Sequence, residues 1–314
     1  MPEATINGIL NIDKPRGMTS FGVVARIRRL TGVRRVGHAG TLDPEASGVL
    51  PVCLGQGTRV IEFLMDTVKS YRARVVLGTV TDTYDAEGRV VERKDPSGIS
   101  RKQVEDALGA FHGTIDQTPP MYSALKHEGK RLYDLARAGI EVERPSRPVM
   151  VYQIEISQWQ MPEFTLEVSC GKGTYIRSLA HDLGQVLGCG AYLKDLVRTR
   201  CGIFSLEDTV TIEQLEEAVA GDCLRQMVYP VDSVLSEWAA VIVDGETEQR
   251  LRNGQSLPLE LNPEEGKDTP SQPSGAVRAV TDNYCRAYNL DGCFVGVLRF
   301  SSESGLWHPE KVFM

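Results

Sequence analysis

Residues 37–50 read G-H-A-G-T-L-D-P-E-A-S-G-V-L, and this stretch decides how the chain is interpreted. Its glycines permit tight turns and close backbone approaches that larger residues resist. Asp43 precedes Pro44, which disfavours a helix there, and an apolar run of strand length follows over 48–54. We therefore expect a loop that presents the Asp43 carboxylate as a nucleophile or general base. A turn-forming role beside proline is the alternative that the residues alone leave open.

Other residues that could carry chemistry each have a structural alternative. His38 titrates near neutral pH, but a lone histidine beside glycines can equally be a hydrogen-bonded structural residue. Tyr71 and Tyr175 could stack on an unpaired base or pack in the core. The run C-G-K-G-T-Y-I-R over 170–177 could cradle phosphate through backbone N–H groups, although it lacks the P-loop pattern.

Length and composition describe a soluble globular protein of two domains, or of one large domain with an appendage. The chain has 314 residues, of which 41% are hydrophobic and 25% charged. No run approaches the ~18 apolar residues of a membrane helix, and the first residues lack a signal-peptide pattern. The 7 cysteines show no C-x-x-C pair and the 5 histidines no H-E-x-x-H pattern. We therefore expect a cytoplasmic protein with no membrane partner, no metal and no disulfide framework.

The charge is unevenly distributed along the chain. The formal net charge is −7, yet residues 205–275 hold four basic and fifteen acidic residues. That segment alone contributes −11, so the rest of the chain sums to +4. A polyanion could therefore bind the front of the chain, which permits a nucleic-acid partner without showing one.

Strand-like and helix-like patterns alternate over the first two hundred residues. Ser20, Ser100 and Thr211 are each expected to cap the start of a helix, the last two with a glutamine three residues later as in a capping box. We expect a further helix over 176–187 and strands over 9–12, 48–54, 71–77, 149–156 and 164–169. The composition changes near residue 230. Strands over 239–243, 277–281, 286–290 and 294–300, with a short helix over 247–251 and a linker over 260–275, predict a small β-rich domain.

Residues 117–148 look like an excursion from the core that is bounded by prolines. Its basic residues suit either an anionic partner or an ordinary solvated face. They are Lys126, Lys130, Arg131, Arg144 and Arg147.

Five sequence blocks, taken together and in this order, resemble the TruB family of tRNA pseudouridine synthases. They are G-I-L-N-I-D-K-P-R-G-M-T-S (8–20), the stretch 37–50, K-S-Y-R-A-R-V-V-L (69–77) with T-D-T-Y-D-A-E-G after it, Q-T-P-P-M-Y-S-A-L-K (117–126) with its continuation to 135, and 171–188. The blocks span residues 8 to 205. The ending G-x-x-x-P-x-K-V-F (305–313) is similar to that of the PUA-like C-terminal domain of bacterial members.

The resemblance implies an α/β (α+β) fold with two domains. Residues 1–229 would form the catalytic domain, with a mixed, largely antiparallel sheet flanked by helices and an RNA-gripping insertion over 119–148. Residues 230–314 would form the small PUA-like β domain.

The resemblance also implies a role for each matching residue. Asp43 would be the catalytic aspartate, and Arg177 would pair with it. His38 would contact the flipped nucleotide, and Tyr71 would stack on the target uracil. The remaining matches are Tyr175 and Leu196 in the uracil pocket, and Lys14 with Pro15 as supports of the active-site loop. Val197 departs from the family, because an arginine often follows the leucine.

The expected activity is conversion of uridine 55 to pseudouridine in the T loop of tRNA, without a cofactor, metal or guide RNA, by a monomer. Asp43 would either add covalently or remove the C2′ proton. The alternatives are an RNA-binding, tRNA-folding module with secondary or lost catalysis, and a guide-RNA-dependent synthase of the same superfamily.

Overall fold

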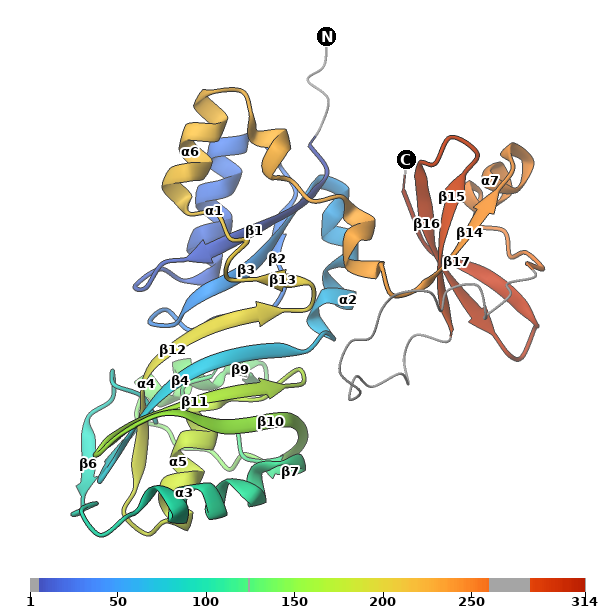
Figure 1. Ribbon diagram of the computed structural model, residues 1–314. Coiled ribbons are helices and arrows are strands. Elements are labelled where there is room, and N and C mark those ends of the chain that lie inside the picture. Colours follow the sequence, from blue (N-terminus) through green and yellow to red (C-terminus); the bar gives the residue numbers. More distant parts are fainter. Residues whose placement is uncertain (1–5, 124, 260–282, 314) are drawn as a thin grey trace.

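The computed structural model describes residues 6–123, 125–259 and 283–313 (Figure 1). Within them, a large sheet has the strand order β1-β3-β12-β4-β11-β10-β7. All of these neighbours pair antiparallel except β12 and β3, which are parallel. The expected mixed, largely antiparallel sheet is therefore confirmed. The strands are β1 (Gly8–Lys14), β3 (Ser47–Leu54), β12 (Ala191–Cys201), β4 (Lys69–Leu77), β11 (Glu163–Cys170), β10 (Arg147–Gln160) and β7 (Gly113–Gln117).

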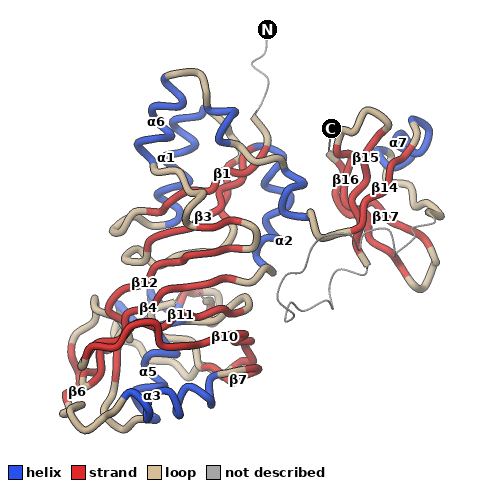
Figure 2. Tube along the Cα trace, in the orientation of Figure 1, coloured by secondary structure: helices blue, strands red, loops and turns tan. Residues whose placement is uncertain are grey.

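Helices and short strands surround this sheet, and β5–β6 and β8–β9 form two small sheets of their own. Figure 2 shows α1 and α6 at one end of the row of strands, and α3 and α5 at the other. The helices are α1 (Ser20–Thr31), α2 (Ile61–Met65), α3 (Arg101–Leu108), α4 (Leu132–Arg137), α5 (Ile176–Val186) and α6 (Ile212–Ala220). The short strands are β2 (Val36–His38), β5 (Thr79–Thr81), β6 (Val90–Arg93), β8 (Lys126–His127), β9 (Lys130–Arg131) and β13 (Phe204–Ser205). None of the helices in the described residues is long and apolar enough to cross a membrane.

Apolar residues on both faces of β1 and β3 follow from burial on both sides of these strands. Leu10 and Ile12 point into a core with α1 and α6, whereas Ile9 and Val49 point into a second core with α2 and the C-terminal strands. Successive residues of a strand face opposite sides, so both sets must be apolar. Each face of this half of the sheet is therefore packed against other elements.

Helix capping matches the sequence at two of three sites. Ser100 and Thr211 each form the expected capping box. For α1 the expectation was wrong by one residue, because Thr19 is the N-cap and accepts from the Gly22 N–H. Ser20 lies inside the first turn, where its hydroxyl is buried and bonds both N–H and C=O of Leu42. Ser20 therefore ties the helix to the loop that carries Asp43.

A four-stranded sheet follows, in the order β14 (Ala239–Val243), β15 (Tyr284–Asn289), β16 (Phe294–Ser301) and β17 (Leu306–Val312), with α7 (Gly245–Arg252). The small C-terminal β domain is confirmed, whereas the strand expected over 277–281 and the linker over 260–275 lie outside the described residues. Phe63 of α2 packs edge-on against Trp238, with ring centroids 5.0 Å apart, so the two sheets share an apolar contact. The domain boundary at 229/230 stays a prediction.

Candidate active site

Asp43 lies on the connection between β2 and β3, and other elements hold that connection. The buried Lys14 ammonium donates to the carbonyl of Pro44 at 2.9 Å, and also to the carbonyls of Pro15 and Met18. The Gly17 N–H donates to the Pro44 carbonyl as well, at 2.9 Å. The backbone on both sides of Asp43 is thus fixed by β1, α1 and the segment between them.

A nearly bidentate ion pair joins Asp43 to Arg177, which comes from the first turn of α5. Arg177 Nε lies 2.9 Å from Asp43 Oδ2, and Nη2 lies 3.3 Å from Oδ1. The arginine side chain is only 6% exposed, whereas the aspartate side chain is 42% exposed. The carboxylate is therefore anchored from the protein side and open to solvent on the other. A group that must reach a substrate needs this arrangement.

A second carboxylate shares the same guanidinium. Asp85 Oδ2 lies 3.2 Å from Arg177 Nη1, and the carbonyls of Thr83 and Tyr122 also accept from the guanidinium. The sequence analysis gave Asp85 no role, and the contact joins positions 92 residues apart in the chain. The available signal was the D-T-Y-D-A-E-G run within one of the family-like blocks.

The pKa of the Asp43 carboxyl reflects opposing influences. Burial raises this pKa above its ordinary value, the Arg177 charge lowers it, and the Asp85 carboxylate raises it. Burial also lowers the pKa of the Lys14 ammonium to about 8. Because the two carboxylates share one arginine, a change at any member of the trio alters how readily Asp43 ionises.

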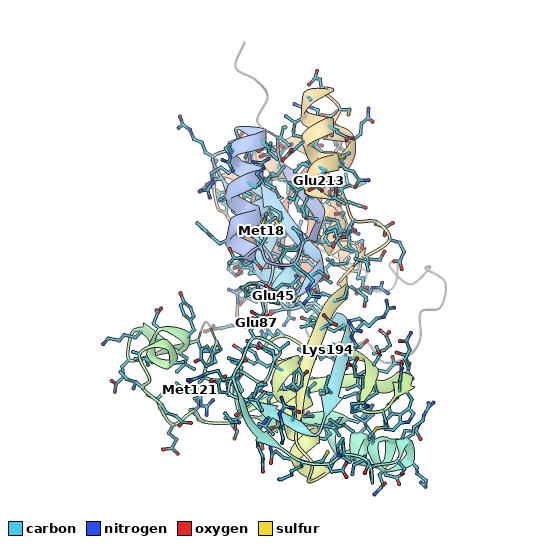
Figure 3. All side chains as sticks on the ribbon, turned by 90° about the vertical axis from the view of Figure 1, so that its left-hand side faces the viewer. Met18, Glu45, Glu87, Met121, Lys194 and Glu213 are labelled. Atoms are coloured by element: carbon cyan, nitrogen blue, oxygen red, sulfur yellow. The ribbon has the colours of Figure 1, made fainter. Side chains whose placement is uncertain are left out.

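Asp43, Asp85, Arg177 and Leu196 line one small cleft of about 30 Å³. Figure 3 looks toward this region and shows Glu45, Glu87 and Lys194, which also line the cleft, lying close together between the upper and lower halves of the large sheet. The expected pocket residue Leu196 is therefore brought beside the aspartate.

His38 lies at the end of β2, and Tyr71 lies on β4. Burial raises the pKa of the Tyr71 hydroxyl to about 12, which keeps it neutral. Burial lowers the pKa of His38, and the nearby Arg198 charge lowers it further. His38 Nδ1 is buried without a hydrogen-bond partner among the described residues. A neutral ring with a free polar atom can accept or donate a hydrogen bond to a ligand.

Tyr175 occupies the N-cap position of α5 without a side-chain capping bond, and Gln117 holds its backbone. Its N–H donates to Gln117 Oε1 at 2.7 Å, and its carbonyl accepts from Gln117 Nε2 at 3.0 Å. The guanidinium of Arg147 lies over the Tyr175 ring, 5.3 Å from its centroid. This contact links the start of β10 to the ring.

The five basic residues of the insertion do not share one environment. Lys130 is exposed in the β8–β9 hairpin, and the side chains of Lys126 and Arg131 lie outside the described residues. Arg144 donates to the Pro119 carbonyl at 3.1 Å, and Arg147 donates to the Gly173 carbonyl at 2.7 Å. The last two therefore brace the base of the insertion, while Lys130 extends from it.

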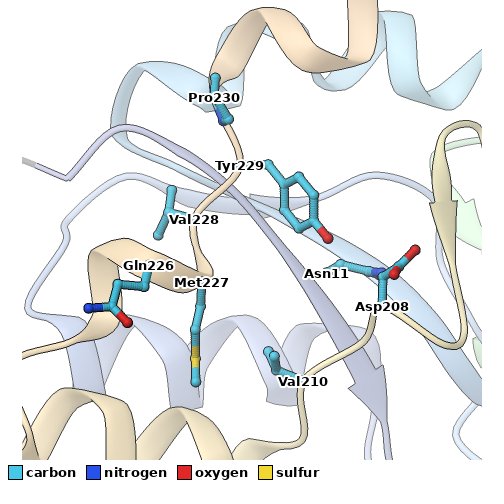
Figure 4. Close-up of a pocket in the computed structure, with 8 residues that line it drawn as sticks. All are labelled: Asn11, Asp208, Val210, Gln226, Met227, Val228, Tyr229 and Pro230. Atoms are coloured by element: carbon cyan, nitrogen blue, oxygen red, sulfur yellow. The ribbon is translucent and has the colours of Figure 1, made fainter.

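A larger cavity, of about 290 Å³, lies elsewhere and contains none of the predicted site residues. Figure 4 shows its lining, with Tyr229 and Pro230 above Asn11 and Val210. The described residues contain no group of three or more His, Cys, Asp or Glu side chains placed to hold a metal ion.

Comparison with known proteins gives consistent matches. The family model described as TruB family pseudouridylate synthase (N terminal domain) matches residues 28–176, and the tRNA pseudouridylate synthase B C-terminal domain matches 177–236. A curated protein of Dehalococcoides mccartyi (strain ATCC BAA-2266 / KCTC 15142 / 195), named tRNA pseudouridine synthase B, is 44% identical over 309 residues, 98% of this chain and 97% of its own. A protein of the same name from Clostridium tetani (strain Massachusetts / E88) is 44% identical over 249 residues, 79% of this chain and 85% of its own.

Solved structures agree with the sequence matches. The chain is similar to a chain in the structure entitled "Crystal Structure of a Cbf5-Nop10-Gar1 Complex", with a TM-score of 0.72 and 26% identity. The match covers 98% of this chain and 85% of the other.

Proposed function

The chain belongs to the TruB family of pseudouridylate synthases, and on this premise we propose that it isomerises uridine 55 to pseudouridine in the T loop of tRNA, with Asp43 as the catalytic residue. The observation that carries the proposal is the ion pair in which a buried arginine presents one partly exposed aspartate to a cleft. Relatives that match nearly the whole chain are named tRNA pseudouridine synthase B.

The reaction is an isomerisation that suits a single carboxylate. The bond between N1 of uracil and C1′ of ribose breaks, the base turns, and C5 joins C1′. The C5 proton is lost and N1 gains a proton, so that no atom is added and no oxidation state changes. Asp43 acts either as the nucleophile at C1′ or as the base that takes the C2′ proton. Both routes need the ionised carboxylate, which the Arg177 charge favours.

The target base must leave its stack before Asp43 can reach the sugar, and unstacking costs a few kcal/mol. We assign Tyr71 to stacking on the flipped uracil, a contact worth about 1–3 kcal/mol per base. Leu196 and Tyr175 would bound the pocket, and His38 would contact the nucleotide. Lys14 would support the loop through the Pro44 carbonyl.

The T arm would be gripped by the insertion over 119–148. We propose that Lys130, which is exposed, contacts phosphate, and that Arg144 and Arg147 fix the base of the insertion. Lys126 and Arg131 complete the proposed contact set. We further propose that residues 1–229 and 230–314 form the two domains, and that the protein acts as a monomer without guide RNA. A cytoplasmic location is supported by the seven cysteines, all of which are free.

The test is pseudouridine mapping of an unmodified tRNA transcript after incubation with the wild-type protein, with Asp43→Asn and with Asp106→Asn. Asp106 is an exposed aspartate of α3 paired with Lys102, so its variant is a matched control. We expect one new pseudouridine, at position 55, with wild type and control, and none with Asp43→Asn. Tight tRNA binding by wild type without modification would favour the RNA-binding, tRNA-folding alternative instead.

A further inference from the structure

Arg198 is a buried arginine in the interior of the large sheet. It lies on β12, whose neighbours are β3 and β4. Arg198 is 1% exposed, and its side chain is the largest of the fully buried side chains in the described residues. An arginine at this depth is uncommon unless it is paired.

The guanidinium of Arg198 spans the two ends of the loop that carries Asp43. Nε donates to the Val49 carbonyl at 2.6 Å, and Nη2 donates to the Gly40 carbonyl at 3.2 Å. Residues 40 and 49 bracket Asp43 on either side. One side chain thus closes the segment 40–49 against the central strand.

The same residue stands beside Tyr71. Arg198 is the cross-strand partner of Tyr71 in the β12–β4 pairing and of Gly48 in the β12–β3 pairing. Cβ atoms of directly opposed residues in antiparallel strands lie about 4.5–5.5 Å apart. The Arg198 side chain also forms a hydrogen bond with the Tyr71 hydroxyl, which lowers the pKa of that hydroxyl against the larger effect of burial.

Stability alone does not explain this residue. Arg198 pairs with no carboxylate among the described residues, and its charge lowers the pKa values of Lys14, His38 and Lys69. Burying a cation without a counter-charge is costly, and a well-packed apolar residue of similar volume is often at least as stabilising. The arrangement is therefore better explained by geometry that an apolar side chain would not supply.

We infer that Arg198 is a positioning residue of the active site: it ties the ends of segment 40–49 and the Tyr71 ring to one strand. The aspartate and the stacking ring then keep a fixed relative arrangement before the substrate arrives. This inference rests on the proposed function. Arg198 does not touch substrate in this scheme, so its loss affects the chemical step rather than tRNA affinity.

The experiment compares wild type, Arg198→Met, Arg198→Lys and the control Arg200→Met in single-turnover pseudouridine formation at saturating enzyme, alongside filter binding of tRNA. Arg200 lies on the same strand but is exposed, so its variant removes the same charge from the surface. We expect Arg198→Met to slow the single-turnover step on the order of 10²-fold, because a small misplacement of reacting groups has effects of this size. Its tRNA Kd should stay within about threefold of the control's, a change under 1 kcal/mol.

A double variant with Tyr71→Phe separates positioning from general weakening of the fold. If Arg198 acts partly through Tyr71, the combined loss of rate is much smaller than the product of the two single losses. If Arg198→Met does not fold, as judged by thermal melting, Arg198→Lys decides the matter. Lysine keeps the charge but cannot reach two carbonyls and a hydroxyl with a planar fork, so the folded variant should still be slowed about tenfold or more.

Three outcomes would overturn the inference: a single-turnover rate within twofold of wild type in a folded Arg198 variant, rate losses that multiply in the double variant, or a loss confined to tRNA affinity. A wild-type protein that forms no pseudouridine would instead refute the proposed function, so the two failures are distinguishable.

Discussion

Replacing Lys14 by methionine tests whether a buried ammonium holds the catalytic loop at a measurable electrostatic cost. The Lys14 side chain is fully buried, and its nitrogen donates to the carbonyls of Pro15, Met18 and Pro44 at 2.9, 2.6 and 2.9 Å. Burial lowers its pKa from 10.5 to about 8. Methionine has similar length and no charge, so it removes the titrating group and the three donated hydrogen bonds together.

The lowered pKa makes stability depend on pH with a definite sign. Above pH 8 the folded protein releases the Lys14 proton while the unfolded chain keeps it until about pH 10.5. The unfolded state then binds more protons, so the free energy of unfolding rises with pH between these values. A shift of one pKa unit is about 1.4 kcal/mol, so the full gain is roughly 3 kcal/mol, of which about 2 kcal/mol is present at about pH 9.5.

The assay is urea denaturation followed by circular dichroism, at neutral pH and at about pH 9.5. Wild type should gain about 2 kcal/mol more than Lys14→Met between the two conditions. Lys69, whose pKa is also lowered by burial, contributes equally to both proteins and cancels. The exposed Lys102→Met variant is the control and should behave like wild type. An equal gain in Lys14→Met and wild type would refute the reasoning.

At neutral pH the same substitution tests stability and catalysis separately. The Pro44 carbonyl keeps the Gly17 N–H as a donor, so at most two carbonyls lose every donor, at about 1–3 kcal/mol each. Removing the charged lysine relieves roughly 3 kcal/mol of burial cost, so the net loss of stability should be at most about 3 kcal/mol. The Pro44 carbonyl loses one of its two donors, and pseudouridine formation should fall at least tenfold on the scale expected of a misplaced catalytic group.

Further predictions concern the ion pair, the RNA grip and the sheet. Arg177→Met removes the charge that lowers the pKa of Asp43, so the acidic limb of the pH–rate profile should move to higher pH, and a shift to lower pH would contradict this. Lys130→Ala should reduce the slope of log Kd against log salt by about one for a phosphate contact, measured by filter binding. Gly48→Ala places a Cβ 2.3 Å from a carbonyl oxygen of β12 at a φ of +97° and should cost about 2–4 kcal/mol in denaturation. The control Gly98→Ala meets nothing within 4 Å and should be close to neutral.

The elements found from sequence were those with strong local signals. The two capping boxes and the strands with runs of β-branched residues were recognised because their patterns lie within a few adjacent residues. β17 was missed as a strand because Pro309 argues against a ladder position. In the structure β17 is an edge strand, and its pairing with β16 is irregular beside Pro309. An edge position with irregular pairing thus tolerates a proline that local strand propensity disfavours.

The site shows the same division between local and long-range information. The residues alone singled out Asp43 by its loop, whereas its pairing with Arg177 came only from the family resemblance. Asp85 was missed because a shared guanidinium joins segments that no local pattern connects. Arg198 was missed because it belongs to no local motif and its bonds reach backbone 149 and 158 positions away in the chain.

Three of the buried cations in the described residues share a physical role that a sequence does not display, whereas Arg177 pairs with carboxylates. Lys14, Lys69 and Arg198 are each buried and each donate to backbone carbonyls. Carbonyls in irregular backbone lack ladder partners and must find donors elsewhere. A lysine or arginine supplies several donors from one side chain, so it can satisfy several loop carbonyls at once and hold them together. The proposed catalytic aspartate can therefore lie on a loop and still be held in place. The Lys14 and Arg198 variants test both the positioning and the free-energy cost of burying a charge beside it.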